Sequence, residues 1–239
     1  MIYEGNFHND VHRYQFAIAV AKFNKTITQR LLDGAIWRLK QAGVTEQQID
    51  VFWVPGSFEL PTIADKLCCV RISGGVHLYN AVICLGAVIK GETSHDLHIN
   101  QSISRHFIDI SRNFEIPVMF GVLTCNNVEQ ANARSVAVEE LYPSGKLEDA
   151  QSVPDKTVAA HLGNKGVDCA EAALEMVDLM EQIEELGCIG CEGCNRCFDD
   201  EDDDRFDDDF DGFDDEFWGG SDDDDDEENE KDDDKDLPF

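Results

Sequence analysis

The run from Gly86 to His95 holds the residues of this chain with the clearest capacity for chemistry. It follows an apolar stretch that predicts a buried strand, and we expect a helix to begin near Ser94. The free amides at a helix start can hold an anion, because they lack partners within the helix and lie at its positive end. Thr93 adds a hydroxyl there, and His95 adds an imidazole that can transfer protons near neutral pH. The run suits an enzyme acting on a phosphorylated substrate, although Gly and Thr at such turns also serve simple helix capping.

The pattern of apolar residues predicts strands that alternate with helices. Unbroken apolar runs typical of buried strands cover residues 16–21, 51–54, 81–85 and 117–123. Helical spacing covers residues 27–39, 60–67, 94–114, 128–141 and 167–186. This order predicts a four-stranded parallel sheet with helices on both faces, which is a three-layer α/β sandwich.

Parallel sheets bind ligands at the carboxyl ends of their strands. The side chains that follow the predicted strands there are aromatic rings, hydroxyls, an imidazole and a guanidinium, contributed by Phe23, Ser57, Phe58, Thr93, His95, Phe120 and Arg134. Taken one at a time, each of these residues could also be an ordinary core aromatic or a solvated residue of a helix. Their joint occurrence at one edge of the sheet predicts a ligand site.

The composition limits the class of protein. The chain has 239 residues and a net charge of −31, which makes it a poor candidate for binding nucleic acid or an anionic membrane. No secretory signal opens it, and no segment approaches the roughly 20 apolar residues of a membrane span, so we expect a cytoplasmic protein. Its nine cysteines then indicate free thiols in a reducing compartment and not a disulfide framework.

The negative charge is concentrated at the C-terminal end. Residues 198–239 contain 25 acidic and three basic residues, so this tail carries 22 of the net negative charges. We predict that the tail is disordered, because it cannot bury enough apolar surface to offset the entropy cost of ordering. Aromatic residues punctuate it, which leaves two hypotheses open: a segment that folds against a basic partner, or a solubilising tail without one. Residues 1–187 have an ordinary composition and suffice for one domain.

Further short motifs occur in a fixed order along residues 5–187. They are Phe23-Asn24, Val54–Pro61, Gly86–His95, Pro117–Gly121, Glu129-Gln130-Ala131 with Arg134, and Gly163–Gly166. With these motifs the chain resembles the lumazine synthase family, the penultimate enzyme of riboflavin biosynthesis. The resemblance implies a flavodoxin-like domain over residues 1–187.

The resemblance implies a transferase that condenses 5-amino-6-(D-ribitylamino)uracil with 3,4-dihydroxy-2-butanone 4-phosphate. The products are 6,7-dimethyl-8-ribityllumazine, phosphate and water, and no metal or organic cofactor takes part. Members of the family form homopentamers whose active sites are shared between neighbouring subunits, and some pack twelve pentamers into a hollow shell of 60 subunits. We expect a pentamer here and leave the shell open.

The resemblance also assigns roles to individual residues. His95 is the proton-transfer residue, while Arg134 holds the substrate phosphate together with Glu92 and Thr93. Phe120 closes the pyrimidine pocket from a neighbouring subunit. The remaining contacts with the pyrimidine ring and its ribityl chain fall to Phe23, Ser57, Phe58, Glu59, Ala87, Val88 and Ile89.

The chain departs from the family pattern in two places before its C-terminal region. Ala87 stands where many members carry Thr, so its role in binding depends on backbone groups. An insertion near residues 138–161 lengthens the connection after Arg134, and Pro143, Gly145 and Pro154 predict a loop there. A lid, a subunit contact and a neutral surface excursion all remain open for it. The role of Lys165 depends on whether the chain returns to the family register after the insertion.

Four evenly spaced cysteines follow the predicted domain, in a hinge of residues 188–197. Cys188, Cys191, Cys194 and Cys197 would suffice as ligands for zinc or an iron–sulfur cluster, with glycines that let a short backbone wrap around the centre. The equal short gaps are equally compatible with a flexible thiol-rich hinge. Metal binding therefore stays undecided at this point.

Two other functions remain compatible with these residues. One is an archaeal-type riboflavin synthase, which shares the same ancestry. The other is a non-catalytic flavin- or lumazine-binding scaffold with a metal-binding tail. The presence of Phe58, Glu59 and His95 together favours lumazine synthase.

Overall fold

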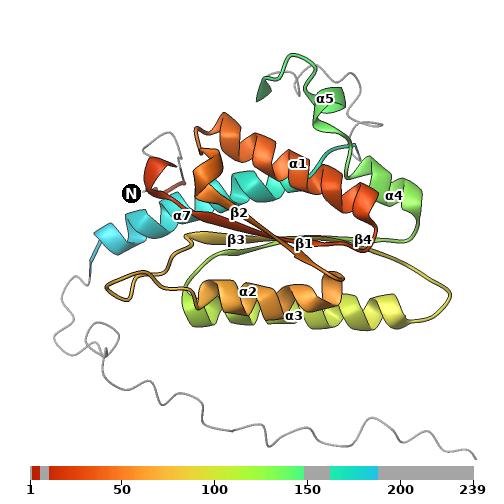
Figure 1. The fold of residues 1–239 in the computed structure, drawn as a ribbon, viewed down its shortest axis with the longest axis horizontal. Helices are drawn as coiled ribbons and strands as arrows, with labels where there is room; N and C mark the ends of the chain where they lie inside the picture. Colours follow the sequence, from red (N-terminus) through yellow and green to blue (C-terminus); the bar gives the residue numbers. More distant parts are fainter. Residues whose placement is uncertain (1, 6–10, 148–161, 188–239) are drawn as a thin grey trace, which may run out of the picture. The chain divides into compact units, whose positions relative to one another are not determined.

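Four parallel strands form the centre of the fold (Figure 1), in the spatial order β2-β1-β3-β4. The computed structural model describes residues 2–5, 11–147 and 162–187. The strands are β1 (Phe16–Ala21), β2 (Ile49–Val54), β3 (Ala81–Ile89) and β4 (Val118–Cys125). The two central strands, β1 and β3, are apolar and buried along nearly their whole length, as expected for a sheet covered on both faces. The predicted four-stranded parallel sheet is confirmed.

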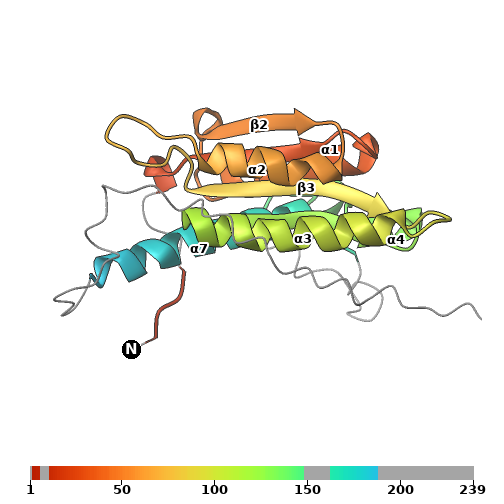
Figure 2. The same ribbon diagram turned by 90° about the horizontal axis from the view of Figure 1, so that it is seen from below.

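Helices cover both faces of the sheet and complete the predicted three layers. The helices are α1 (Lys25–Gln41), α2 (Leu60–Cys68), α3 (His95–Phe114), α4 (Val128–Ala133), α5 (Val138–Leu141) and α7 (Lys165–Glu185), with short 3-10 helices at Val11–Arg13, Glu46–Gln48 and Ser57–Glu59. In Figure 1, α1 and α7 lie on one face, and α2 and α3 lie on the other. Figure 2 views the molecule from the side of α2 and α3. A separate apolar core fills each space between helices and sheet.

Strand β3 is longer than predicted, since it continues through Gly86 to Ile89. Gly86 does not end the strand, because residues 82–89 pair with β4 in parallel register. A Cβ atom at Gly86 would lie 2.5 Å from the hydroxyl oxygen of Ser57, so glycine permits the close approach of the segment after β2. The predicted end of the strand at residue 85 was therefore wrong, and residues 87–89 form its carboxyl end.

The helix predicted over residues 128–141 is divided into α4 and α5. Helix α4 ends at Ala133, where the carbonyl oxygens of Ala133 and Arg134 accept hydrogen bonds from the amides of Gly163 and Lys165. The amide of Val136 in turn donates to the carbonyl oxygen of Gly163 and not to that of Asn132, four residues earlier. A continuous helix was predicted because its apolar spacing is local, whereas the groups that end it come from beyond the insertion.

Several predictions fall on residues outside the described ranges. They concern the inner part of the insertion (148–161), the cysteine-rich hinge (188–197) and the acidic tail (198–239). Among the helices that the structure describes, none combines the length and apolarity needed to cross a membrane.

Candidate active site

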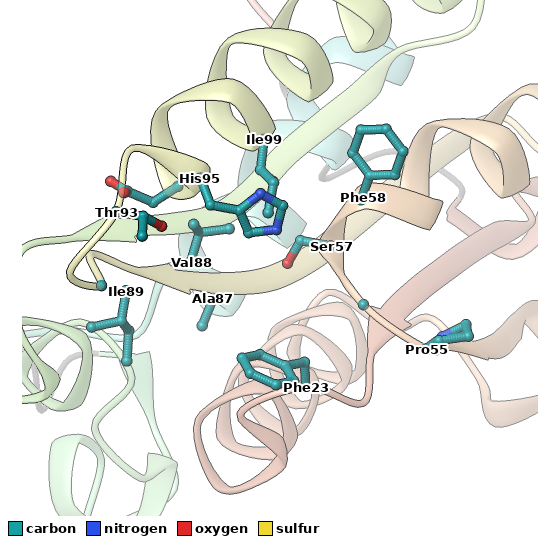
Figure 3. A pocket seen from close by; sticks show the side chains of 13 residues that line it. Phe23, Pro55, Ser57, Phe58, Ala87, Val88, Ile89, Thr93, His95 and Ile99 are labelled. Carbon is teal, nitrogen blue, oxygen red and sulfur yellow. The ribbon is translucent and has the colours of Figure 1, made fainter.

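A cavity of about 380 Å³ opens at the carboxyl ends of β1, β2 and β3 (Figure 3). Most of the side chains around it are apolar, and its polar groups are few: the hydroxyls of Ser57 and Thr93, the imidazole of His95 and the carboxylate of Asp96. The lining residues are Phe23, Pro55, Gly56, Ser57, Phe58, Ala87, Val88, Ile89, Gly91, Thr93, His95, Asp96 and Ile99. A mainly apolar cavity with a few convergent polar groups is typical of a small-molecule site.

The turn between β1 and α1 brings Phe23 to the cavity. The amide of Phe23 donates to the carbonyl oxygen of Pro55, 3.1 Å away, which ties this turn to the end of β2. The next residue, Asn24, has a left-handed backbone with φ of 57°, and its side-chain amide donates to the carbonyl oxygen of Ala87 at 2.9 Å. These two bonds join the ends of three strands, so the Phe23 ring is held at the cavity edge although 69% of the residue is exposed.

The segment after β2 brings Ser57 and Phe58 to the same cavity. Ser57 is buried against Gly86, whereas Phe58 is 59% exposed. The carboxylate of Glu59 accepts a hydrogen bond from the amide of Gly56 at 2.8 Å and does not line the cavity. In Figure 3 the rings of Phe23, Phe58 and His95 lie around the Ser57 hydroxyl.

The loop after β3 contributes Thr93 and His95, which both line the cavity. Helix α3 begins at His95, within one residue of the predicted start, and Ser94 caps it without a side-chain hydrogen bond. The amides of Glu92 and Thr93 donate to no acceptor in the described part of the chain. Such free amides before a helix can bind an anion. The side chain of Glu92 is exposed and does not line the cavity.

Phe120 lies on β4 outside the cavity lining of its own chain. Its ring contacts Phe107 of α3, with 5.8 Å between the ring centroids, and the residue is 45% exposed. This position differs from those of Phe23 and Phe58, which flank the cavity directly.

Arg134 caps the C-terminus of α4 and does not line the cavity. Burial raises the pKa of the Cys125 thiol, and the Arg134 guanidinium acts in the opposite direction, so Arg134 is near the end of β4. Cys125 is the register partner of Ile89, which lines the cavity. The Arg134 guanidinium donates to the carbonyl oxygen of Gln130 at 3.2 Å. No acidic side chain pairs with it among the described residues.

Sequence reasoning missed two lining residues, Asp96 and Ile99, and assigned no individual role to Pro55, Gly56 and Gly91 of the recognised segments. Asp96 and Ile99 carried a usable signal, because they lie within one turn of His95 at the start of a predicted helix. Within the described ranges, no group of three or more His, Cys, Asp or Glu side chains is arranged to hold a metal ion.

A family model described as 6,7-dimethyl-8-ribityllumazine synthase matches residues 13–181 of the chain. This range covers more than half of the chain and includes every residue that lines the cavity.

Proposed function

The chain belongs to the 6,7-dimethyl-8-ribityllumazine synthase family, and we propose that the cavity at the carboxyl edge of its sheet is the active site. The chain is a transferase of riboflavin biosynthesis. The enzyme condenses 5-amino-6-(D-ribitylamino)uracil with 3,4-dihydroxy-2-butanone 4-phosphate, and releases 6,7-dimethyl-8-ribityllumazine, phosphate and water. The observation that carries the proposal is the meeting of Phe23, Ser57 and His95, from three different loops, around one cavity.

The apolar part of the cavity binds the pyrimidine substrate. The rings of Phe23 and Phe58 are largely exposed in the free protein, so both have a face available for stacking against a planar ring. Ala87, Val88 and Ile89 supply the backbone edge of β3 alongside, and Ser57 supplies a hydroxyl. Because residue 87 is Ala, hydrogen bonds there depend on backbone groups. Glu59 acts on the same side by fixing the Gly56 turn.

The loop before α3 binds the phosphate of the second substrate. Support comes from the free amides of Glu92 and Thr93 and from the Thr93 hydroxyl in the cavity wall. The guanidinium of Arg134 completes the site, since its planar donors suit a phosphate and no carboxylate competes for it in the described residues.

His95 transfers protons between the reacting atoms. The amine of the pyrimidine substrate attacks the ketone carbon, and the carbonyl oxygen takes up protons and leaves as a first water. Loss of a carbon-bound proton accompanies departure of phosphate. The ribitylamino nitrogen then attacks the second carbonyl carbon, and loss of a second water closes the ring. An imidazole can give and take these protons near neutral pH. Holding the two substrates in register supplies much of the remaining acceleration.

We propose that the chain assembles as a homopentamer, and the exposed Phe120 supports sites shared between neighbouring subunits. Phe120 is half-exposed outside the cavity of its own chain, so it is available to close the pyrimidine site of a neighbouring subunit. Whether twelve such pentamers form a 60-subunit shell is left open. The strong negative charge of residues 198–239 supports a basic partner for the tail.

The direct test mixes the two substrates with the purified full-length chain and follows the fluorescence of the lumazine product. We expect fluorescence to appear only when both substrates are present, with release of one phosphate for each lumazine. Absence of product with correctly folded protein would overturn the proposed function.

A further inference from the structure

We propose that Asn164, assisted by Arg30, is a positioning residue that holds Arg134 in place for phosphate binding. The inference deepens the proposed function and rests on it. Asn164 is only 3% exposed, and it lies where the chain returns from the insertion to begin α7. None of the roles assigned above uses its side chain.

The side-chain amide of Asn164 makes hydrogen bonds to three separate segments. Its nitrogen donates to the carbonyl oxygens of Arg30 on α1 and Val136 after α4, at 2.8 and 2.9 Å. Its oxygen accepts from the amides of Gly166 and Val167 in the first turn of α7, at 2.9 and 3.4 Å. Both amide hydrogens and both oxygen lone pairs are thus used, which is the full capacity of this side chain.

Two glycines let the backbones approach Asn164 closely. A Cβ atom at Gly34 of α1 would lie 2.3 Å from the Asn164 side-chain oxygen, and one at Gly166 would lie 1.8 Å from the carbonyl oxygen of Leu31. Helices α1 and α7 therefore meet almost backbone to backbone here. The packing leaves Asn164 little freedom to move.

The backbone around Asn164 is bonded directly to the backbone around Arg134. The amides of Gly163 and Lys165 donate to the carbonyl oxygens of Ala133 and Arg134, at 2.8 and 2.9 Å. The amide of Val136 donates back to Gly163 at 3.0 Å. Arg134 is thus fixed from the side of α7.

Arg30 fixes the same segment from the side of α1. Its guanidinium donates to the side-chain oxygens of Asn132 and Ser135, at 2.5 and 3.2 Å, and these residues flank Arg134. The Arg30 carbonyl oxygen meanwhile accepts from Asn164. The backbone of Arg134 is held on both sides, whereas its guanidinium donates one hydrogen bond among the described residues, to the carbonyl oxygen of Gln130.

Arg134 lies next to the insertion, which begins four residues later at Val138. A displacement of about 1 Å in a substrate-binding group can cost on the order of 100-fold in rate. The bonds of Asn164 and Arg30 therefore hold the backbone of Arg134 where its guanidinium can bind phosphate.

The test compares Asn164→Ala with Gln48→Ala in the full chain. Gln48 is a matched control, because it is also buried and donates to two carbonyl oxygens, those of Val11 and Tyr14, at the opposite end of the sheet. We expect Asn164→Ala to raise the KM for the phosphorylated substrate about 10-fold or more and to leave the KM for the pyrimidine within about 2-fold. The inhibition constant of inorganic phosphate should rise in parallel.

Gln48→Ala should lower Tm comparably without changing either KM. An unchanged KM for the phosphorylated substrate in Asn164→Ala, or an equal rise in Gln48→Ala, would overturn the inference. If Asn164→Ala does not fold, Arg30→Leu takes its place in the test. This substitution keeps the hydrogen bond from Asn164 to the backbone carbonyl of residue 30 and removes the guanidinium that donates to Asn132 and Ser135.

The two proposals fail in distinguishable ways. If the unmodified chain makes no lumazine, the proposed function fails. The positioning role can then still be measured as the rise in Tm that inorganic phosphate gives, which should be absent in Arg134→Ala and reduced in Asn164→Ala. An equal rise in Tm in the unmodified chain and in Asn164→Ala would exclude the positioning role.

Discussion

The amide of Lys165 donates a hydrogen bond to the carbonyl oxygen of Arg134 across 2.9 Å, although the insertion separates the two residues in sequence. The segments before and after the insertion therefore lie side by side. The ammonium group of Lys165 contacts the carboxylate of Asp168, and its backbone lies directly beside the residue proposed to bind phosphate. The bond places the backbone of Lys165 beside Arg134, and the role of its ammonium group stays a prediction.

Excision of the insertion should preserve catalysis. Because Val136 and Gly163 are hydrogen-bonded neighbours, residues 138–161 can be replaced by a short glycine linker without moving Arg134. We expect both KM values to stay within about 3-fold of those of the full chain. The free energy of unfolding should fall by about 0.5–1.5 kcal/mol, since the deletion removes the Tyr142 ring that stacks on Trp37 at 4.2 Å. Tyr142→Ala alone is the control, and a loss of activity that it does not share would indicate a lid or subunit contact.

Arg134→Ala should chiefly weaken binding of the phosphorylated substrate. A charge-assisted hydrogen bond contributes about 1.5–3 kcal/mol, so its loss should raise the KM for that substrate about 10- to 100-fold. Arg134→Lys should recover part of the affinity, because an ammonium keeps the charge and lacks the planar pair of donors. Steady-state kinetics with each substrate varied in turn measures both effects. A rise confined to the KM for the pyrimidine would contradict the assignment.

His95→Ala should lower kcat and leave both substrates bound. Loss of acid–base assistance is expected to reduce kcat by a factor on the order of 10²–10⁴. His106→Ala is a suitable control, since His106 is an exposed histidine on the same helix and does not line the cavity. The rate of lumazine formation at saturating substrate gives the comparison. Full activity in His95→Ala would exclude the proton-transfer role.

Phe58→Ala should affect binding far more than folding. Its ring is 59% exposed in the free protein, so the free energy of unfolding should change by less than about 1 kcal/mol. The KM for the pyrimidine should nevertheless rise about 10-fold, because the ring stacks on the bound substrate. Ile108→Ala, at an exposed apolar residue of α3, should change neither quantity. Equal effects of the two substitutions on the KM would argue against stacking.

The buried thiols of the domain should resist alkylation. Burial raises the pKa values of Cys68 and Cys169 to about 12, and that of Cys84 is raised well above its ordinary value. A raised pKa leaves little of the reactive thiolate near pH 8, so reactivity should appear only as the pH rises or the chain unfolds. The exposed Cys69 is the internal control and should react. Peptide mass spectrometry after iodoacetamide treatment reads out each site, and rapid labelling of Cys84 in the folded protein would contradict the burial.

The regular elements of the domain were predictable because their signals are local. Strand β1 has the bounds predicted from its apolar run. Helix α2 begins at the predicted residue and ends one residue later, and α7 begins two residues earlier and ends one residue earlier than predicted. The end of β3 was not predictable in this way. Gly86 is a strand breaker when judged alone, but pairing with β4 and the close contact with Ser57 keep it in the sheet.

The chain by itself determined the residue types of the site and the alternation of strands and helices that brings them to one edge. Phe23, Ser57, Phe58 and His95 follow three predicted strands, and in the structure they line one cavity. Their types and order were enough because parallel strands share a carboxyl edge.

Only the tertiary structure decided which neighbours complete the site and what holds them. It brings Asp96 and Ile99 into the cavity wall, sets Arg134 beside the end of β4, and surrounds Asn164 with partners from three segments. These relationships depend on strand register and on hydrogen bonds between residues far apart in the chain. No local pattern of residue types contains that information, because the partner of each group is chosen by packing.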